Sequence, residues 1–349
     1  IKILLGNVKI KKIIFYSFIG VLGFIVILLT VLLNYRPHVP QLEKYGIEAS
    51  LPSTDNGLIV QFTGNTNILI SDGKTSILTD GFFTRPDVAK VLWGEVAPDE
   101  TVIKYCLDRA GIQKLDAVIP VHSHFDHAMD SPIVAELTGA TLIGSESTAN
   151  IGRGLRFPEH KMVIPKSGKV IQLGTFKVTL VKGRHWPYPD TEMRAKLLDR
   201  EIALPLIPPS NAFEYVEGVS YTIIIEHAEA TVAIHGSAGF IPNVLNEYEV
   251  DILFLGLAGL ETMDGVYNDN YQMHVVDALS PDVIVPIHWD DFFVPLKDGI
   301  KSRSLLEKVL QGMDVKKSFE MVEERNPNRK MVVLPLWGRL NVSEIRRKE

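Results

Sequence analysis

Two patterns of hydrophobic positions divide this chain. Residues 13–33 form one apolar run without a charged side chain, whereas from residue 57 onward short apolar runs alternate with turn residues such as glycine. Apolar runs of about four to eight residues between turns are typical of strands, and apolar positions three and four apart are typical of helices. The pattern therefore predicts an apolar N-terminal helix followed by an α/β domain.

The order of the predicted elements indicates two sheets. Strands come first, then helices with strands, then a second series of strands, and finally helices with strands again. Because each sheet must bury one face against another layer, this order predicts an αββα sandwich of two mixed β-sheets flanked by helices. Strands are expected at 57–64, 66–73, 75–81, 115–121, 141–144, 161–165, 169–173, 176–183, twice within 219–236, at 250–259, 282–288 and 329–338. Helices are expected at 98–111, 130–140, from Ser145, near 268–280 and near 302–311.

The N-terminal run is long enough to cross a membrane. A helix of about 20 residues spans the roughly 30 Å hydrocarbon layer, and four lysines precede residue 13. This lysine excess predicts a basic cytoplasmic segment at 1–12, a single-pass transmembrane anchor at 13–33, and a remainder outside the cytoplasm, either periplasmic or extracellular. A cleaved signal peptide is the alternative, although the following "LLNYRPHVP" offers no small residues for cleavage.

The rest of the chain divides into a linker and one large domain. Residues 34–56 contain Pro37, Pro40 and Pro52 with polar residues between them, which is typical of a linker. The domain is expected over 57–349. Within it, residues 186–218 are rich in proline and aromatic residues and too long for a plain turn, so an insertion or lid is expected there.

Composition and charge narrow the classes of function. The 349 residues are 46% hydrophobic, enough for a large core. The net charge is −6 and no basic stripe with interleaved aromatics occurs, so nucleic-acid binding is not expected. Cys106 is the one cysteine, which excludes an intrachain disulfide and a Cys-x-x-Cys motif. It falls on the apolar side of a predicted helix and is expected to be a buried thiol.

The stretch "HSHFDH", directly after the predicted strand 115–121, carries the clearest chemistry. Neutral imidazoles and carboxylates are good zinc ligands. In an extended segment His122 and His124 point to the same side, and a turn after them directs Asp126 and His127 towards a neighbouring position. One short loop can then serve two metal ions, whereas unpaired polar groups beside a buried strand would cost several kcal/mol. A solvated histidine-rich loop is the alternative.

Further ligands are expected from histidines where apolar strands end. His185, His235 and His288 each stand at such a position, which is where binding residues gather. The other histidines have no such setting and are expected on the surface, in the linker or on helices: His38, His160, His227 and His274.

The motif, together with Asp80 in "ILTDG" and with "VIVPIHWDDF" downstream, resembles the metallo-β-lactamase superfamily over about residues 57–340. This resemblance implies one or two zinc ions, with manganese or iron as alternatives. It assigns His122, His124 and His185 to the first metal and Asp126, His127 and His288 to the second. It also implies that Asp80 orients the ligands, with a turn-forming Asp-Gly as the alternative.

One position departs from the resemblance. The superfamily usually carries an aspartate that bridges both metals, and here Ser237 occupies the matching place. Serine is a poor zinc ligand. His235 lies two residues earlier and would face the same way in an extended strand, so it is expected to supply a substitute ligand. Otherwise the second metal is weakly bound or absent.

These observations predict a metal-dependent hydrolase. A zinc-activated hydroxide would attack an ester, an amide or a phosphodiester, with Asp126 orienting the water and His235 or Tyr188 helping to stabilise the oxyanion. The substrate is expected to be a small molecule or a lipid. Residues 13–33 are expected to contact the membrane.

Three alternatives remain open. The "RHWPYPD" loop and Arg194 are loosely similar to the branch that hydrolyses N-acylphosphatidylethanolamine in the manner of a phospholipase D. A catalytically silent metal-binding module would be marked by the change at Ser237. An iron-containing redox member would need the full acidic bridge, which this sequence lacks.

Overall fold

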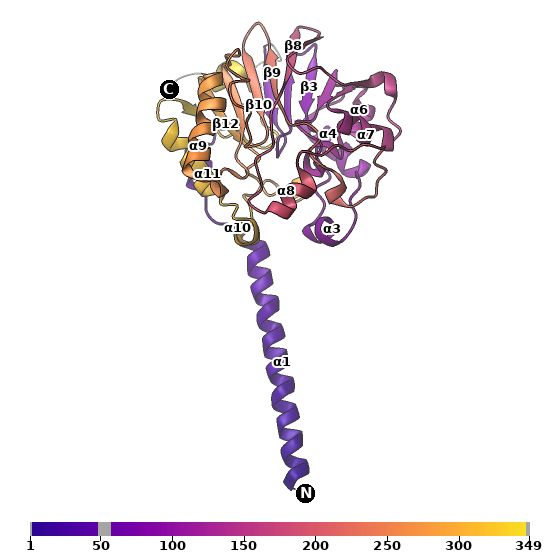
Figure 1. Ribbon diagram of the computed structural model, residues 1–349, viewed down its shortest axis with the longest axis vertical. Coiled ribbons are helices and arrows are strands. Elements are labelled where there is room, and N and C mark those ends of the chain that lie inside the picture. Colours follow the sequence, from indigo (N-terminus) through magenta and orange to yellow (C-terminus); the bar gives the residue numbers. More distant parts are fainter. Residues whose placement is uncertain (1, 48–56, 347–349) are drawn as a thin grey trace.

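Two facing β-sheets with helices on their outer sides form the body of the protein, which confirms the predicted αββα sandwich (Figure 1). The computed structural model describes residues 2–47 and 57–346. Within these residues each sheet has seven strands.

The first sheet combines an antiparallel and a parallel half. β1, β2, β3 and β14 pair in antiparallel fashion, and β3 to β6 are parallel. The order is β14-β1-β2-β3-β4-β5-β6. The strands are β1 (Ile59–Phe62), β2 (Ile68–Ser71), β3 (Ser76–Thr79), β4 (Ala117–Ile119), β5 (Thr141–Ile143), β6 (Met162–Val163) and β14 (Arg339–Asn341).

The second sheet mirrors this arrangement. β7 to β10 are antiparallel neighbours, and β10 to β13 are parallel. β8, β10 and β12 therefore run in the same direction and end at the same end of the sandwich. The order is β13-β12-β11-β10-β9-β8-β7. The strands are β7 (Val170–Leu173), β8 (Phe176–Lys182), β9 (Tyr221–Glu226), β10 (Thr231–His235), β11 (Ile252–Gly256), β12 (Val283–Ile287) and β13 (Lys330–Met331).

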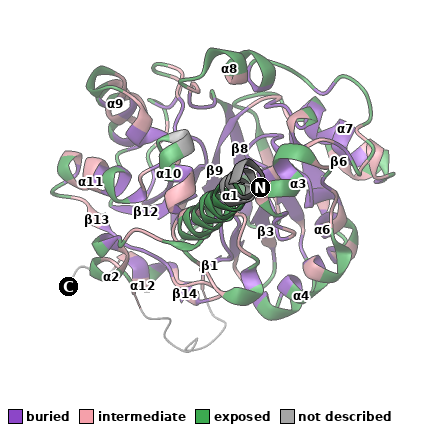
Figure 2. Ribbon diagram, turned by 90° about the horizontal axis from the view of Figure 1, so that it is seen from below, coloured by how far each residue is buried: buried purple, intermediate pink, exposed green. Residues whose placement is uncertain are grey.

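Helices cover the outer faces of both sheets, and the main core lies between the sheets. Figure 2 shows buried strands in the middle and exposed helical surfaces around them. The α-helices are α1 (Lys2–Asn34), α2 (Pro40–Lys44), α3 (Val88–Trp93), α4 (Glu100–Ala110), α5 (Phe125–Ala128), α6 (Ser131–Thr138), α7 (Glu146–Gly154), α8 (Thr191–Leu197), α9 (Gly265–Tyr271), α10 (Leu305–Gln311), α11 (Val315–Arg325) and α12 (Val342–Arg346). Short 3-10 turns are η1 (Glu159–Lys161), η2 (Ala212–Glu214), η3 (Leu260–Thr262) and η5 (Leu296–Asp298), and η4 (Gln272–Asp277) is π-helical.

Side-chain burial explains why these segments fold as they do. Val60, Phe62 and Ile70 on the first sheet belong to the same buried cluster as Val178 and Phe254 on the second. A separate cluster fills the space between the first sheet and α4 and α6. It contains Cys106, as expected, and burial raises the pKa of this free thiol to about 12.

The predicted apolar helix is present as α1. Its segment Lys12–Asn34 has a mean hydropathy of 2.6 and is not buried against the domain. By length and composition it is a candidate membrane span. The helix begins before the expected span, at Lys2.

The expected linker at 34–56 is only partly extended. Residues after Asn34 pack on the domain, where Val39 and Gln41 are buried and Gly46 forms a β-bridge with Val333. Residues 48–56 lie outside the described residues. The residues that follow α1 therefore contact the domain directly.

The segment 186–218 is bound into the fold along its length. It contains α8 and η2, and Tyr215 within it is almost fully buried. The backbones of Val96 and Ser210 exchange hydrogen bonds of 2.8 and 3.1 Å. Its role as a lid stays a prediction.

Candidate metal centre

The histidine-rich motif lies where β4 ends. His122 and His124 stand on the connecting loop, and Asp126 and His127 belong to the one-turn helix α5. The carbonyl of His124 accepts hydrogen bonds from the backbone N–H groups of His127 and Ala128, at 3.0 and 2.9 Å. This turn brings the four side chains to one end of the sandwich, where His185 and His288, which follow strands of the second sheet, join them.

The first group contains His122, His124 and His185, whose candidate ligand atoms lie within 4.8 Å of one another. All three side chains are buried. Nε2 of His122 is 3.0 Å from Nδ1 of His124. Nδ1 of His185 lies 2.8 Å from the carbonyl oxygen of Trp186, so Nδ1 carries the proton and Nε2 is left with its lone pair.

The second group contains Asp126, His127 and His288. Oδ2 of Asp126 lies 3.4 Å from Nε2 of His127 and 3.4 Å from Nε2 of His288. The two Nε2 atoms are 3.3 Å apart. An ion with tetrahedral bonds of about 2.0–2.1 Å separates its ligands by about 3.3–3.4 Å. The three atoms therefore fit three corners of a tetrahedral site.

The protonation states of four of the five histidines suit metal binding. Burial lowers the pKa of His124 and of His288 to about 4, and lowers the pKa values of His122 and His185 further. These imidazoles are neutral at pH 7 and offer lone pairs. At the fifth, burial opposes the charged form, but the carboxylates of Asp126 and Asp80 outweigh it and raise the pKa of His127. Burial works against ionisation of Asp126, but the surrounding histidines outweigh it and hold the pKa of this carboxyl well below its usual range.

Asp80 contacts a residue of the second group, and its role in orienting the ligands stays a prediction. Its Oδ2 lies 2.7 Å from Nδ1 of His127, and its Oδ1 accepts a hydrogen bond from the backbone N–H of Val121. Thr66 Oγ1 also lies 3.0 Å from Nδ1 of His127. A carboxylate on Nδ1 fixes the proton there and leaves Nε2 to face the ion.

A network that the sequence did not indicate holds the loops of the second group together. The carbonyl of Asn65 accepts from the N–H of His288, and its side-chain amide donates to the carbonyl of Asp126. Asp290 accepts from the N–H of Asn65 and forms a 2.6 Å ion pair with Arg85. Both side chains of this ion pair are fully buried.

Glu217 and Arg303 support one histidine each and were also missed. Glu217 accepts a 3.0 Å hydrogen bond from the N–H of His185. Arg303 lies 3.2 Å from Nδ1 of His288 and forms an ion pair with Glu307. Among the residues of this network, Asp290 is one that the sequence could have indicated, because it lies within the "VIVPIHWDDF" stretch beside His288.

His235 does not reach either group, which corrects the expectation that it replaces the missing bridge. Its Nε2 donates to the carbonyl of Gly239 at 2.9 Å, and its Nδ1 pairs with the Thr222 hydroxyl at 2.8 Å. Both ring nitrogens are therefore used within the fold, and no lone pair is free for a metal or an oxyanion. Ser237 accepts a 3.1 Å hydrogen bond from the N–H of Trp186, so it positions the chain beside His185.

Tyr188 lies at the edge of the first group. Its ring centroid is 5.2 Å from that of His185, and the residue is half-buried. Burial raises the pKa of its phenol, with the negative charge of Asp126 acting in the same direction. The hydroxyl is therefore protonated at neutral pH and remains a hydrogen-bond donor.

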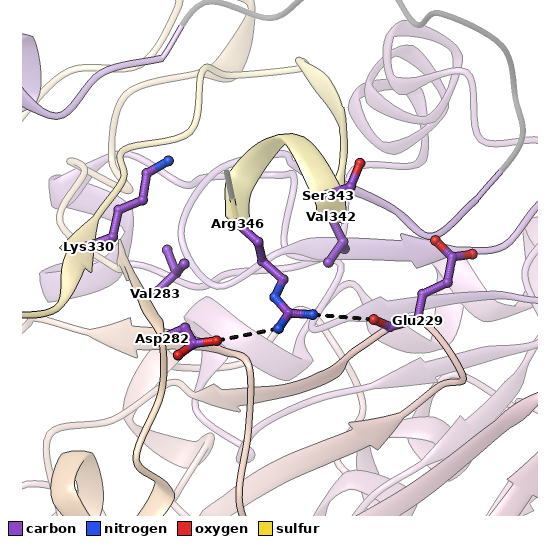
Figure 3. Close-up of a pocket in the computed structure, with 7 residues that line it drawn as sticks. All are labelled: Glu229, Asp282, Val283, Lys330, Val342, Ser343 and Arg346. Carbon is purple, nitrogen blue, oxygen red and sulfur yellow. Dashed lines mark hydrogen bonds and ion pairs between the residues drawn. The ribbon is translucent and has the colours of Figure 1, made fainter. Parts of the chain in front are cut away.

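A separate surface pocket lies at the other end of the second sheet (Figure 3). It has a volume of about 450 Å³ and includes Asp282 and Val283 at the start of β12, whereas His288 follows the end of that strand. Arg346 forms ion pairs there with Asp251 and Asp282. This pocket does not belong to the metal centre.

Comparison with known proteins finds a matching family model and several similar proteins. A family model described as a beta-lactamase superfamily domain matches residues 59–288. A UPF0173 metal-dependent hydrolase from Heliobacterium modesticaldum is 32% identical over 107 residues, which cover 31% of this chain and 38% of that protein. A UPF0173 protein from Pyrococcus abyssi is 25% identical over 198 residues, covering 56% of this chain and 76% of that protein. Among solved structures, the metallo hydrolase Igni18 from Ignicoccus hospitalis has a TM-score of 0.49 at 16% identity and covers 81% of this chain and 97% of that one.

The family model spans well over half of the chain, so the protein belongs to the beta-lactamase superfamily. Its two groups of ligand-type side chains and its similarity to metal-dependent hydrolases define an enzyme of that class.

Proposed function

We propose that the protein hydrolyses an ester, an amide or a phosphodiester with two metal ions held between its sheets. The observation that carries this proposal is the pair of buried three-residue groups, of which the second has tetrahedral spacing. His122, His124 and His185 would hold the first ion, and Asp126, His127 and His288 the second.

The donor atoms favour zinc. Five imidazoles and one carboxylate suit Zn²⁺, and manganese or iron remain alternatives that elemental analysis distinguishes. A bound divalent ion supplies Lewis acidity, which makes water a nucleophile near neutral pH and polarises the oxygen of the substrate's carbonyl or phosphoryl group.

The protein's own residues orient the reaction. Asp126 offers a second carboxylate oxygen that can accept a hydrogen bond from the attacking water and set its direction. Tyr188, which is protonated and whose ring centroid is 5.2 Å from that of His185, would donate a hydrogen bond to the developing oxyanion. Asp80 and Glu217 keep His127 and His185 in place during the reaction.

The contacts of Arg194 give the phospholipase-like alternative no support. Arg194 donates two hydrogen bonds to the carbonyl of Tyr188, at 3.1 and 2.7 Å, so it holds the "RHWPYPD" loop together. Hydrolysis of N-acylphosphatidylethanolamine therefore stays a prediction of the sequence alone. The silent binding module and the enzyme differ in turnover, which the following experiment measures.

The test combines metal analysis with turnover. Wild type, His122→Ala and the surface control His160→Ala would be purified without chelators and assayed on p-nitrophenyl acetate, p-nitroacetanilide and bis-p-nitrophenyl phosphate. We expect two metal ions per chain in wild type and the control, fewer in His122→Ala, and loss of turnover only in His122→Ala. Metal without turnover of any probe would favour the binding module, and absence of metal from wild type would overturn the proposal.

We also propose that α1 anchors the protein in a membrane with its domain outside the cytoplasm. The support is the exposed apolar segment Lys12–Asn34 and the lysines before it. A signal sequence is the alternative. Recovery of the intact N-terminal residues from membranes would support the anchor, and a soluble protein that begins beyond residue 34 would contradict it.

A further inference from the structure

Exposed apolar side chains occur on helices at the end of the domain where α1 joins it (Figure 1). Trp93 at the end of α3 is 81% exposed and its neighbour Leu92 is 39% exposed. Val309 on α10 is 62% exposed, and Tyr35, directly after α1, is 56% exposed. Single exposed apolar residues are common on soluble proteins, so their shared position is the informative feature.

The helices that carry Leu92, Trp93 and Val309 lie on the side of the domain from which α1 departs (Figure 1 and Figure 2). Figure 1 shows α3 and α10 along the lower side of the domain, at the level where α1 leaves it, and Figure 2 shows both helices flanking α1 when viewed from below. A membrane crossed by Lys12–Asn34 would have its surface at this level.

The orientation of the domain relative to α1 is fixed by polar contacts. Arg36 forms a 2.7 Å ion pair with Asp291, whose side chain is buried, and the carbonyl of Tyr35 accepts a 2.9 Å hydrogen bond from the N–H of Leu305. Both partners belong to the chain segment that follows His288. The start of the domain is thus attached to the loop that carries a candidate metal ligand.

The same side of the domain carries the metal centre. Val91 on α3 is buried in one cluster with Ala128 and Met129, which follow the histidine-rich motif. Phe292 packs against this cluster, with its ring centroid 6.2 Å from that of Phe125 and 5.8 Å from that of His288. The inner face of α3 therefore contacts the loops of the metal centre, while its end residues Leu92 and Trp93 face outward.

We infer that the patch formed by Tyr35, Leu92, Trp93 and Val309 lies on the surface of the bilayer and holds the metal-centre end of the domain against it. The inference rests on the proposed anchor. Tryptophan and tyrosine favour the membrane interface, where the ring is apolar and its polar atom meets water. The anchor also keeps the patch at a high effective concentration near the bilayer, so a few apolar contacts suffice for stable docking.

This arrangement determines which molecules reach the site. With its metal-centre end on the bilayer, the protein would take amphiphilic substrates from the membrane surface. A second copy of the chain is the competing occupant of the patch, and the experiment below separates the two.

Quenching of Trp93 by brominated lipid tests the docking. The full chain would be reconstituted into phosphatidylcholine vesicles with or without bromine on the acyl chains, and the Trp93 signal taken as the difference between wild type and Trp93→Phe. We expect bromine to reduce the Trp93 emission at least about twofold, because an interfacial indole lies within reach of the acyl chains. The buried Trp186 and Trp289 should change little.

A matched control places the reporter at the opposite end of the sandwich. Lys74 is exposed in the turn before β3, whereas Asp80 at the metal centre follows the end of that strand. In Trp93→Phe/Lys74→Trp, the new indole should show no quenching. Equal emission of Trp93 in both kinds of vesicle would overturn the docking, and an emission shift that depends on protein concentration but not on bromine would identify a second copy as the occupant.

The outcome is independent of catalysis. Quenching requires neither metal nor turnover, so a chain that docks but hydrolyses no probe would contradict the proposed hydrolase and leave the docking supported. Flotation of the vesicles monitors the anchor: a chain that fails to float with the lipid would overturn the anchor and the docking together.

Discussion

At the residue scale, two residues of the candidate metal centre have a left-handed backbone conformation that L-residues rarely adopt. Asp80 has φ of 54° and His288 has φ of 56°. Such a conformation costs of order 1–3 kcal/mol and persists where surrounding contacts determine it. Asp80 has these contacts, since its N–H donates to Ile119 and its carbonyl accepts from the Ser131 hydroxyl. The fold thus holds these residues where the ligands need them.

Asp80→Asn should weaken metal binding without emptying both groups. The amide can no longer fix the proton on Nδ1 of His127 as a carboxylate does, and loss of such a partner costs about 10- to 100-fold in metal affinity. Chelator competition measures the change at the second group. The control is Asp72→Asn, in the turn between β2 and β3. Unchanged affinity in Asp80→Asn would reduce Asp80 to a turn residue.

Asp290→Ala should strongly destabilise the fold, because it leaves the fully buried Arg85 without its partner. Breaking a buried pair on one side costs about 3–5 kcal/mol. Urea unfolding in detergent, compared with Glu100→Ala, gives the effect. The pair between Glu100 and Lys104 is exposed and contributes less than about 1 kcal/mol. A similar decrease in the free energy of unfolding in both variants would contradict the role assigned to the buried network.

His235 should make the stability depend on pH. Burial lowers its folded-state pKa from 6.5 to about 4, so between these values the unfolded chain binds a proton that the folded chain does not. Its stabilising contribution is complete above about pH 6.5 and is lost as the pH falls towards 4, by about 2 kcal/mol between pH 7 and pH 5. His235→Gln should lack this part of the slope, since the histidines of the metal groups contribute equally to both proteins. If the free energy of unfolding changed with pH in parallel for wild type and His235→Gln, this contribution of His235 would be excluded.

At the scale of elements, the apolar periodicity predicted the paired strands well and the polar or short elements poorly. α11 was missed because its sequence "VKKSFEMVEER" buries few residues, among them Phe319 and Val322. β14 has three residues and pairs with β1, more than 270 positions earlier, so Val60 meets Leu340 only in the folded chain. The helix expected near 268–280 begins earlier, at Gly265, and continues as a π-helical turn.

The candidate ligands were predictable for a related reason. Local spacing indicated the loop from His122 to His127, and the ends of apolar strands indicated His185 and His288. A strand end specifies which end of the sheet a residue occupies and not what its side chain meets. His235 was therefore misjudged, because Thr222 on the neighbouring strand and Gly239 take its nitrogens. Asn65, Arg85 and Glu217 act through contacts that no local pattern contains.

At the scale of the whole molecule, each candidate metal group combines side chains that follow strands of both sheets. His122 and His124 follow β4 of the first sheet, whereas His185 follows β8 of the second. Asp126 and His127 likewise belong to the first sheet's loop, and His288 follows β12. Each bound ion would therefore join the two halves of the sandwich.

Removal of the metal should consequently lower the stability of the whole fold. Ions that bind only the folded chain stabilise it by about 4 kcal/mol at a thousandfold excess over their Kd. Thermal unfolding with and without a chelator measures this, with His122→Ala showing a smaller response than wild type. An unchanged transition temperature would mean that bound ions do not stabilise the packing of the two sheets.

If bound ions join the two sheets, the lifetime of the folded protein depends on the supply of metal. In a metal-poor medium, chains would open along the seam between the sheets and become substrates for proteases. Abundance, and not turnover alone, would then report the free metal concentration of the compartment.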